Sequence, residues 1–170
     1  MRRVLLTIIL AVTLSGAGCS AGLQGDMYRG NGFAFRIGAV PEAWHRVEVS
    51  HAALAFRDDR DDSTIVVNAR CGLDGEDVPL AALTQHLFLR FTDREIQEQA
   101  VVPFDQREAM RSVVTAKLDG VPMKFDIWVL KKDGCVYDFA YMAPPPHFAG
   151  GAPEFERFVR GFSTATAHAD

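Results

Sequence analysis

Alternating apolar and polar positions early in the chain predict β-strands. Residues 33–37 alternate large apolar side chains with Ala and Arg, and Pro41 ends the run. Farther on, the apolar run 53–56 and the β-branched run 64–67 lie on either side of the polar segment 58–63. Two strand-like runs joined by a polar turn predict a β-hairpin.

The second half of the chain predicts longer antiparallel strands. Residues 94–104 have the character of one strand, and two Asp-Gly pairs follow, at 119–120 and 133–134. Asp-Gly between alternating apolar runs is a strong signal for a two-residue hairpin turn. The sequence therefore predicts a three-strand meander after residue 104.

The two turns also predict which side chains share a face of the meander. Val114 is expected opposite Phe125, and Trp128 opposite Phe139. One face is an apolar core face, made of Val114, Ala116, Leu118, Met123, Phe125, Ile127, Val129, Val136, Ala140 and Met142. The other face mixes aromatic and charged side chains, among them Arg111, Lys117, Lys124, Asp126, Trp128, Tyr137, Phe139 and Tyr141.

Two segments have the spacing of amphipathic helices, because apolar residues recur every three or four positions in residues 79–92 and 153–162. The order of elements is hairpin, helix, antiparallel strands, helix. It predicts an α+β domain in which an antiparallel β-sheet, built from the N-terminal hairpin and the C-terminal meander, is flanked by two main helices.

The first 18 residues have the layout of a secretory signal peptide. Arg2 and Arg3 form a short positive region, residues 4–14 are apolar and uncharged, and small residues follow. The apolar run is shorter than the roughly 20 residues that a membrane-spanning helix needs. We therefore expect export and cleavage.

Cys19 follows the small residues directly, and this segment resembles a bacterial lipobox. In that motif the cysteine becomes the first mature residue and its sulfur takes a diacylglycerol. Ala17 and Gly18 fit the motif, whereas Gly16 stands where Leu is usual. A free thiol or half of a disulfide is the competing interpretation. By resemblance to Gram-negative lipoproteins, Ser20 favours the outer membrane.

Cleavage before Cys19 leaves 152 residues, a length that indicates one domain. We expect residues 19–32 to be a flexible tether, 33–165 a single globular domain and 166–170 a disordered tail. The mature chain has 16 Lys and Arg against 22 Asp and Glu, a net charge of −6. An acidic chain without a basic cluster is a poor nucleic-acid binder, so its membrane attachment would depend on the lipid.

The three cysteines favour one disulfide. If Cys19 is lipidated, Cys71 and Cys135 remain, and two cysteines can pair. Both stand at predicted strand ends in a chain expected in an oxidising compartment. Two buried, unpaired thiols are the alternative.

No motif in the sequence points to catalysis, a metal or a cofactor. Gly-x-Ser-x-Gly, His-Glu-x-x-His and a glycine-rich phosphate loop are absent, and the five histidines are scattered. Four carboxylates crowd residues 58–62, but they lack the ligand order of an EF-hand, and Arg60 stands among them. This composition favours a solvated hairpin tip over a calcium site.

The mixed face of the meander is the candidate binding surface. It consists of Trp128, Tyr137, Phe139, Tyr141, Lys124, Asp126 and Arg111, and the loop 143–151 would add His147. That loop would also bring Phe148 near the strand end at Tyr141. Aromatic side chains mixed with Arg are typical of binding surfaces. The competing interpretation is that a helix covers this face and the charges lie at its rim, because large aromatic side chains are usually core.

The opening segment 33–44, with its Phe-x-Phe-x-Ile, Pro and Trp, and the order of elements after it resemble the PsbP-like fold. That fold includes the photosystem extrinsic protein and bacterial lipoproteins of the DcrB and LpqN type. The resemblance spans residues 33–162 and implies a non-catalytic binding or assembly module. We therefore expect an envelope lipoprotein that binds a protein partner. The alternatives are a carrier of a small apolar ligand or lipid, and an envelope hydrolase.

Overall fold

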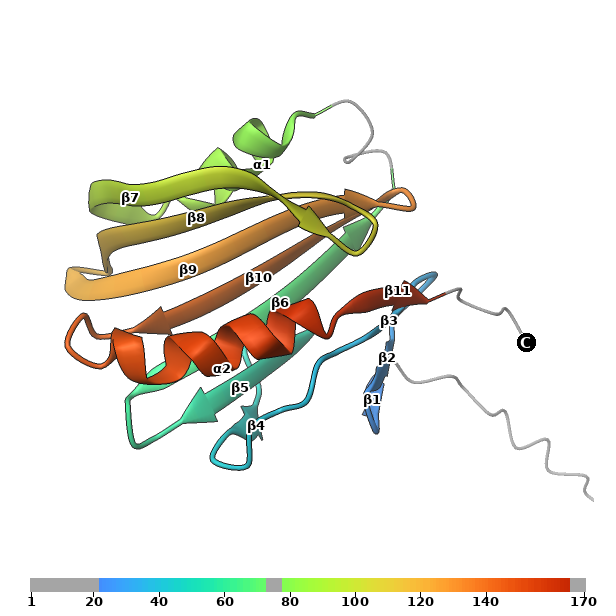
Figure 1. The fold of residues 1–170 in the computed structure, drawn as a ribbon, viewed down its shortest axis with the longest axis horizontal. Helices are drawn as coiled ribbons and strands as arrows, with labels where there is room; N and C mark the ends of the chain where they lie inside the picture. The colour runs from blue at the N-terminus through green and yellow to red at the C-terminus, as the bar shows by residue number, and fades with distance from the viewer. Residues whose placement is uncertain (1–21, 73–77, 166–170) are drawn as a thin grey trace, which may run out of the picture.

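The computed structural model describes residues 22–72 and 78–165, and it has the α+β architecture that the sequence predicts (Figure 1). The predicted signal peptide, Cys19 and the predicted C-terminal tail lie outside the described residues. The main sheet is antiparallel, with strand order β4-β5-β6-β10-β9-β8-β7. Its strands are β4 (His45–Val47), β5 (Leu54–Asp58), β6 (Ser63–Cys71), β7 (Phe91–Phe104), β8 (Arg107–Leu118), β9 (Val121–Lys132) and β10 (Cys135–Ala143).

A second, small sheet has the order β1-β2-β3-β11. Its strands are β1 (Gly22–Gln24), β2 (Met27–Arg29), β3 (Ala34–Arg36) and β11 (Ser163–Ala165). The two helices are α1 (Leu80–Leu87), between β6 and β7, and α2 (Phe148–Arg160), between β10 and β11. In Figure 1, α2 crosses the main sheet, α1 lies beside β7 and β8, and the small sheet sits beyond the end of α2.

The register predicted from the two Asp-Gly turns is confirmed. Val114 lies opposite Phe125 across β8 and β9, and Trp128 lies opposite Phe139 across β9 and β10. The turn residues at 119–120 and 133–134 all have φ between 51° and 85°. Both central residues of a tight turn of this kind need positive φ, which Asp and Gly tolerate better than most residues.

Each face of the main sheet is covered by one helix over its central strands, whereas the edge strand β7 is mostly exposed. Helix α1 lies over β8 and β9 and contributes Leu83 to a core with Val114, Phe125 and Ile127. This is the face that the sequence predicts to be apolar. Helix α2 lies over β10, β6 and β9 on the opposite face. The sheet is therefore the middle layer of the domain.

The prediction that residues 19–32 form a flexible tether is wrong for residues 22–29, which form the β1–β2 hairpin. Strand β2 pairs with β3, and the Tyr28 ring stacks on Phe35 with centroids 4.9 Å apart. Strands of three residues are too short to show a period of two, and Gly25 makes the hairpin turn with φ of 59°. The folded domain therefore begins by Gly22 and not at Phe33.

Both predicted helix boundaries are also corrected. Helix α1 ends at Leu87 and not at Thr92, because Phe91 begins β7 and stacks on Phe125 at 4.3 Å. Helix α2 begins at Phe148 and not at Pro153, so residues 148–151 belong to its first turn. Gly151 is required there, because a Cβ atom at this position would stand 2.6 Å from the Tyr141 hydroxyl.

The predicted disulfide is confirmed. Cys71 ends β6, Cys135 begins β10, and the two residues are direct cross-strand neighbours with their Cα atoms 4.0 Å apart. The bridge joins residues that are 64 positions apart in the sequence. It ties the β5–β6 hairpin to the C-terminal meander at one end of the main sheet.

Candidate functional site at the loop end of the sheet

The four aromatic residues of the predicted binding surface lie in the core beneath α2. Trp128, Phe139 and Tyr141 have no exposed area, and Tyr137 is 2% exposed. Phe162, just after α2, packs on Phe139 with ring centroids 4.8 Å apart. The expectation of an accessible aromatic surface is therefore corrected, and the arrangement matches the competing interpretation of a helix over this face.

The charged members of that surface form the rim of the α2 core. Arg111 donates to both carboxylate oxygens of Asp126, from Nε to Oδ1 at 3.1 Å and to Oδ2 at 3.3 Å, and from Nη2 to Oδ2 at 2.7 Å. Burial raises the pKa of Asp126, and the hydrogen bonds from Arg111 oppose this rise. The guanidinium groups of Arg111 and Arg160 both lie over the Trp128 ring, 5.4 and 5.5 Å from its centroid.

The charges around Trp128 neutralise one another. Arg160 is paired with Glu156 at 2.8 Å, as Arg111 is with Asp126 at 2.7 Å. The Trp128 indole N–H lowers the pKa of Asp126 less than Arg111 does. It makes no hydrogen bond, so Arg111 is the main partner of this carboxylate. Every group here is covered or paired within the chain, and we interpret the cluster as structural.

Four connections meet at one end of the main sheet, which we call the loop end: residues 59–62, 88–90, 119–120 and 144–147. The strand register places them together. Phe91 pairs with Leu118, which pairs with Val121, and Lys124 pairs with Ala143. Met142 in turn pairs with Thr64, next to the β5–β6 turn. Loops at one end of a rigid sheet are where binding residues concentrate.

The loop end exposes apolar side chains. Leu89, between α1 and β7, is 77% exposed, and Val121, at the start of β9, is 57% exposed. Arg90 and Asp119 lie 3.6 Å apart and link the two connections that carry these residues. Neither apolar residue was predicted, because both stand at turns, where no periodic pattern shows whether a side chain is buried.

His147 and Lys124, two further members of the predicted surface, also lie at the loop end. The prediction that Phe148 lies near Tyr141 is confirmed, because the Tyr141 hydroxyl donates a hydrogen bond to the Phe148 carbonyl at 3.0 Å. Burial raises the pKa of Tyr141 to about 12, so this hydroxyl stays protonated at neutral pH. The Lys124 ammonium lies 4.8 Å from the Phe148 ring centroid, and His147 is exposed.

The acidic β5–β6 turn is held by arginines from within its own hairpin. Arg60 donates to Asp58 at 2.7 Å and holds the pKa of that buried carboxyl below its usual value. Arg57 pairs with Asp59 and Asp62. Within residues 22–72 and 78–165, no three His, Cys, Asp or Glu side chains are placed to hold a metal ion.

A buried carboxylate that the sequence did not reveal lies on the face of α1. Asp138 of β10 is 3% exposed and accepts a hydrogen bond from the Asn68 side chain at 2.7 Å. Arg70 lies 3.4 Å away with its side chain 57% exposed. Burial is the largest influence on Asp138 and raises its pKa. The alternation of β10 places Asp138 on the same face as Val136 and Ala140, but the sequence does not show that this carboxylate is buried with Asn68 as its partner.

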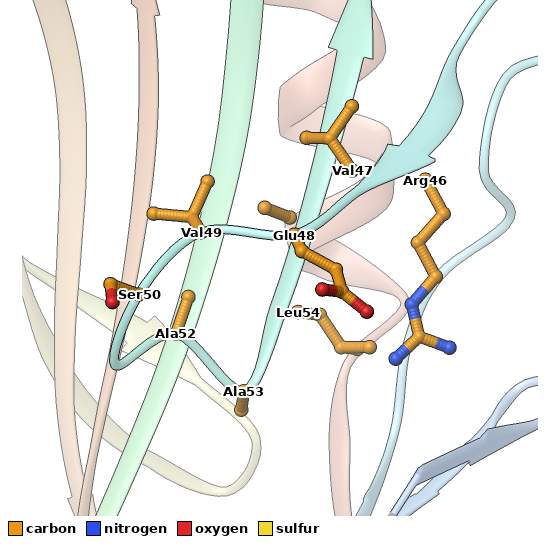
Figure 2. Close-up of a pocket in the computed structure, with 9 residues that line it drawn as sticks. Arg46, Val47, Glu48, Val49, Ser50, Ala52, Ala53 and Leu54 are labelled. Carbon is orange, nitrogen blue, oxygen red and sulfur yellow. The ribbon is translucent and has the colours of Figure 1, made fainter.

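A shallow hollow lies at the β4–β5 connection, with a volume of about 450 Å³ (Figure 2). The residues known to line it come from one segment, residues 46–55. Figure 2 shows the charged ends of Arg46 and Glu48 on the same side of this connection, with Val49 and Ser50 farther along it. A hollow that is formed by one surface loop and carries two charged groups differs from the enclosed apolar cavity that a lipid carrier needs.

Comparison with known proteins identifies the fold. No protein-family model and no curated protein sequence matches the chain. The structure resembles the PsbP protein CyanoP of Synechocystis sp. PCC 6803, with 16% identity, 91% of this chain and 98% of that chain covered, and a TM-score of 0.58. It also resembles LpqN of Mycobacterium tuberculosis, a protein involved in cell envelope biogenesis, with 14% identity, coverages of 80% and 87%, and a TM-score of 0.54.

A Bacteroides thetaiotaomicron protein matches with 14% identity and a TM-score of 0.58, over 85% of this chain and 50% of that one. At these identities the likeness concerns the fold alone, and the chain has the PsbP-like α+β fold. Among the residues that the structure describes, no helix is both long enough and apolar enough to cross a bilayer.

Proposed function

We propose that this protein is a non-catalytic lipoprotein of the cell envelope, anchored through Cys19, which binds a protein partner at the loop end. The proposal rests on one observation. Gly22, the first described residue, belongs to the small sheet at one end of the molecule, whereas the exposed Leu89 and Val121 lie at the other end. Strand β11 of the small sheet contacts the β7–β8 turn through Asp105 and Thr164. That turn is at the opposite end of β8 from residues 119–120.

The packing of the core favours a binding module over a carrier or an enzyme. Large side chains between the sheet and the helices, among them Trp128, Phe125 and Phe155, have no exposed area, so the layers are filled. The buried carboxylates of Asp126 and Asp138 are held by neighbouring Arg or Asn side chains. LpqN, a protein of similar fold, is involved in cell envelope biogenesis, which is compatible with an envelope role.

The anchor is tested by replacing Cys19 with Ser. We expect the wild-type protein to incorporate labelled fatty acid and to fractionate with membranes. The Cys19→Ser variant should take up no label and should be released or left unprocessed. A variant that is still labelled and membrane-bound would show that the lipobox interpretation is wrong.

The partner surface is tested with serine substitutions at exposed apolar residues. Leu89→Ser combined with Val121→Ser should weaken capture of the crosslinked envelope partner by about tenfold or more, because both substitutions remove apolar area that binding would bury, and about 1.4 kcal/mol corresponds to tenfold in affinity. Val101→Ser is the matched control, since Val101 on β7 is 52% exposed and lies away from the loop end. Equal capture by both variants would place the partner elsewhere.

The carrier alternative has its own readout. Native mass spectrometry of the purified domain should give the mass of the polypeptide alone if the protein is a binding module. A co-purified lipid or apolar ligand in the spectrum would favour the carrier.

A further inference from the structure

The distance between the anchor and the folded domain is short. Two residues, Ser20 and Ala21, separate Cys19 from Gly22, where β1 begins. Three residue steps of extended chain span at most about 11 Å. A lipid anchor at Cys19, which is part of the proposed function, would therefore hold the start of the β1–β2 hairpin within about 11 Å of the membrane surface.

The small sheet cannot swing freely relative to the main sheet, because three contacts join them. The Asp105 carboxylate accepts hydrogen bonds from the Thr164 backbone N–H at 2.9 Å and from the Lys132 ammonium at 2.8 Å. The Phe35 ring lies against Phe162, with centroids 5.5 Å apart. The Gly38 N–H donates to the Phe158 carbonyl at 3.2 Å. Fixing the hairpin at a surface thus fixes the orientation of the whole domain.

The outer face of the small sheet carries two arginines, and its other residues are small or uncharged. Tyr28 and Phe35 are paired and face the core, so the neighbouring pair Met27 and Arg36 faces outward, as does Arg29. Arg36 forms an exposed ion pair with Asp26 at 2.8 Å. Arg29 is exposed and has no ion pair with any residue in the described ranges. An unpaired arginine near a bilayer is attracted to phosphate groups.

The net charge of the chain supports this orientation. The mature chain has 22 acidic against 16 basic residues, so an anionic surface repels the domain as a whole. The acidic β5–β6 turn lies at the loop end, and its four carboxylates in residues 58–62 outnumber the two arginines, Arg57 and Arg60, that pair with them. An anionic bilayer therefore favours contact through the arginines of the small sheet and disfavours contact through the loop end.

We infer that the outer face of the small sheet lies against the phospholipid headgroups of the membrane that anchors Cys19, with Arg29 facing the phosphates. The inference rests on the lipid anchor of the proposed function and adds a membrane-contact surface and an orientation. The twelve residues of β8 span about 40 Å, so the loop end would face away from the bilayer.

Headgroup quenching tests the orientation in the full lipidated protein. The protein is reconstituted in vesicles of phosphatidylethanolamine and phosphatidylglycerol that contain a headgroup nitroxide lipid. A fluorophore is attached to Gln24→Cys or, as the matched probe at the loop end, to Thr92→Cys; both positions are exposed. The native disulfide is left intact. We expect severalfold stronger quenching at position 24. Equal quenching, or stronger quenching at position 92, would overturn the inference.

The contribution of Arg29 is tested by charge reversal. Arg29→Glu should reduce quenching at position 24, and the reduction should be larger in vesicles with phosphatidylglycerol than in vesicles of phosphatidylcholine alone. An unchanged signal in both would overturn the contact between Arg29 and the phosphates. Insertion of a ten-residue Gly/Ser segment after Ser20 is a second check, and it should reduce the difference between positions 24 and 92.

The outcomes separate this inference from the proposed function. If fatty-acid labelling shows no lipid on Cys19, both the anchor and the orientation fail. If Cys19 is lipidated but position 24 is not preferentially quenched, the orientation alone fails. Partner capture through Leu89 and Val121 is measured independently of both.

Discussion

The Cα atom of Gly38 lies against Gly161, so close that a Cβ atom added to Gly161 would stand 2.4 Å from it. Here the chain leaving β3 crosses the C-terminal end of α2. A Cβ atom on Gly38 would in turn lie 2.3 Å from the Phe158 carbonyl oxygen. Both glycines are therefore required by backbone-to-backbone packing, and together they let the small sheet dock on the main sheet.

Gly161→Ala should lower the free energy of unfolding by about 1–3 kcal/mol, because the added methyl group meets a backbone that cannot rotate away. Gly161 has φ of −84°, so the cost comes from packing and not from a disfavoured dihedral. Chemical denaturation measures the change. Gly22→Ala is the control, because nothing lies within 4 Å of a Cβ atom at that position. Equal effects of the two substitutions would contradict the crossing.

Trp128→Ala should destabilise the domain by about 3–5 kcal/mol, because it removes a fully buried aromatic side chain. Trp128→Phe should cost much less, since the indole N–H has no hydrogen-bond partner to lose. Thermal or denaturant unfolding provides the measurement. If Trp128→Ala left stability unchanged and abolished partner binding, the aromatic face would be the binding surface after all.

Loss of the disulfide should lower stability by about 4 kcal/mol at most, the value from loop-closure entropy for a bridge between residues 64 apart. Cys71→Ala with Cys135→Ala and reduction of the wild-type domain should give similar losses in denaturant unfolding. Cys19→Ser should cause none. A double variant as stable as the wild type would mean that the bridge contributes nothing to the fold.

Asp138 should make the domain less stable at neutral pH than at mildly acidic pH. Burial raises its pKa above 3.8 in the folded state, so the folded state binds the proton more tightly than the unfolded state. This group therefore adds stability as the pH falls through the raised pKa towards 3.8, and the gain is lost as the pH rises. Asp138→Asn, which can still accept from Asn68, should remove this dependence.

The measurement is the difference in unfolding free energy between Asp138→Asn and the wild type at several pH values. We expect the variant to match or exceed the wild type at pH 7, and its relative advantage to shrink towards pH 3.8. Asp119→Asn at the exposed β8–β9 turn serves as the control for the loss of one carboxylate. An Asp138→Asn variant that is weakest at neutral pH would show that the Arg70 and Asn68 contacts outweigh the burial.

Local chemistry made the meander predictable. Asp and Gly at 119–120 and 133–134 can adopt the positive φ that a tight turn needs, so the pairing of Trp128 with Phe139 follows from two dipeptides. The cysteine pair followed from strand ends and parity. The first inference rests on adjacent residues in the sequence, and the second rests on the number of cysteines.

Tertiary packing decided what the sequence left open. The alternating pattern separates the two faces of the meander, but it does not say that α2 covers the face with Trp128. Arg111 and Asp126 look like surface charges until their bidentate pairing is known. Leu89 and Val121 stand at turns, where exposure depends on what packs nearby, so the loop end emerged only from the strand register.

Site-specific photo-crosslinking in the membrane-anchored protein tests the central claim most directly. A photoreactive amino acid replaces Leu89 at the loop end or Val101 on β7, two exposed apolar positions at different places on the sheet. The account predicts a discrete crosslinked protein from position 89, none from position 101, and loss of the position-89 product in the Cys19→Ser background. Crosslinks of equal strength from both positions, or from position 101 alone, would contradict it.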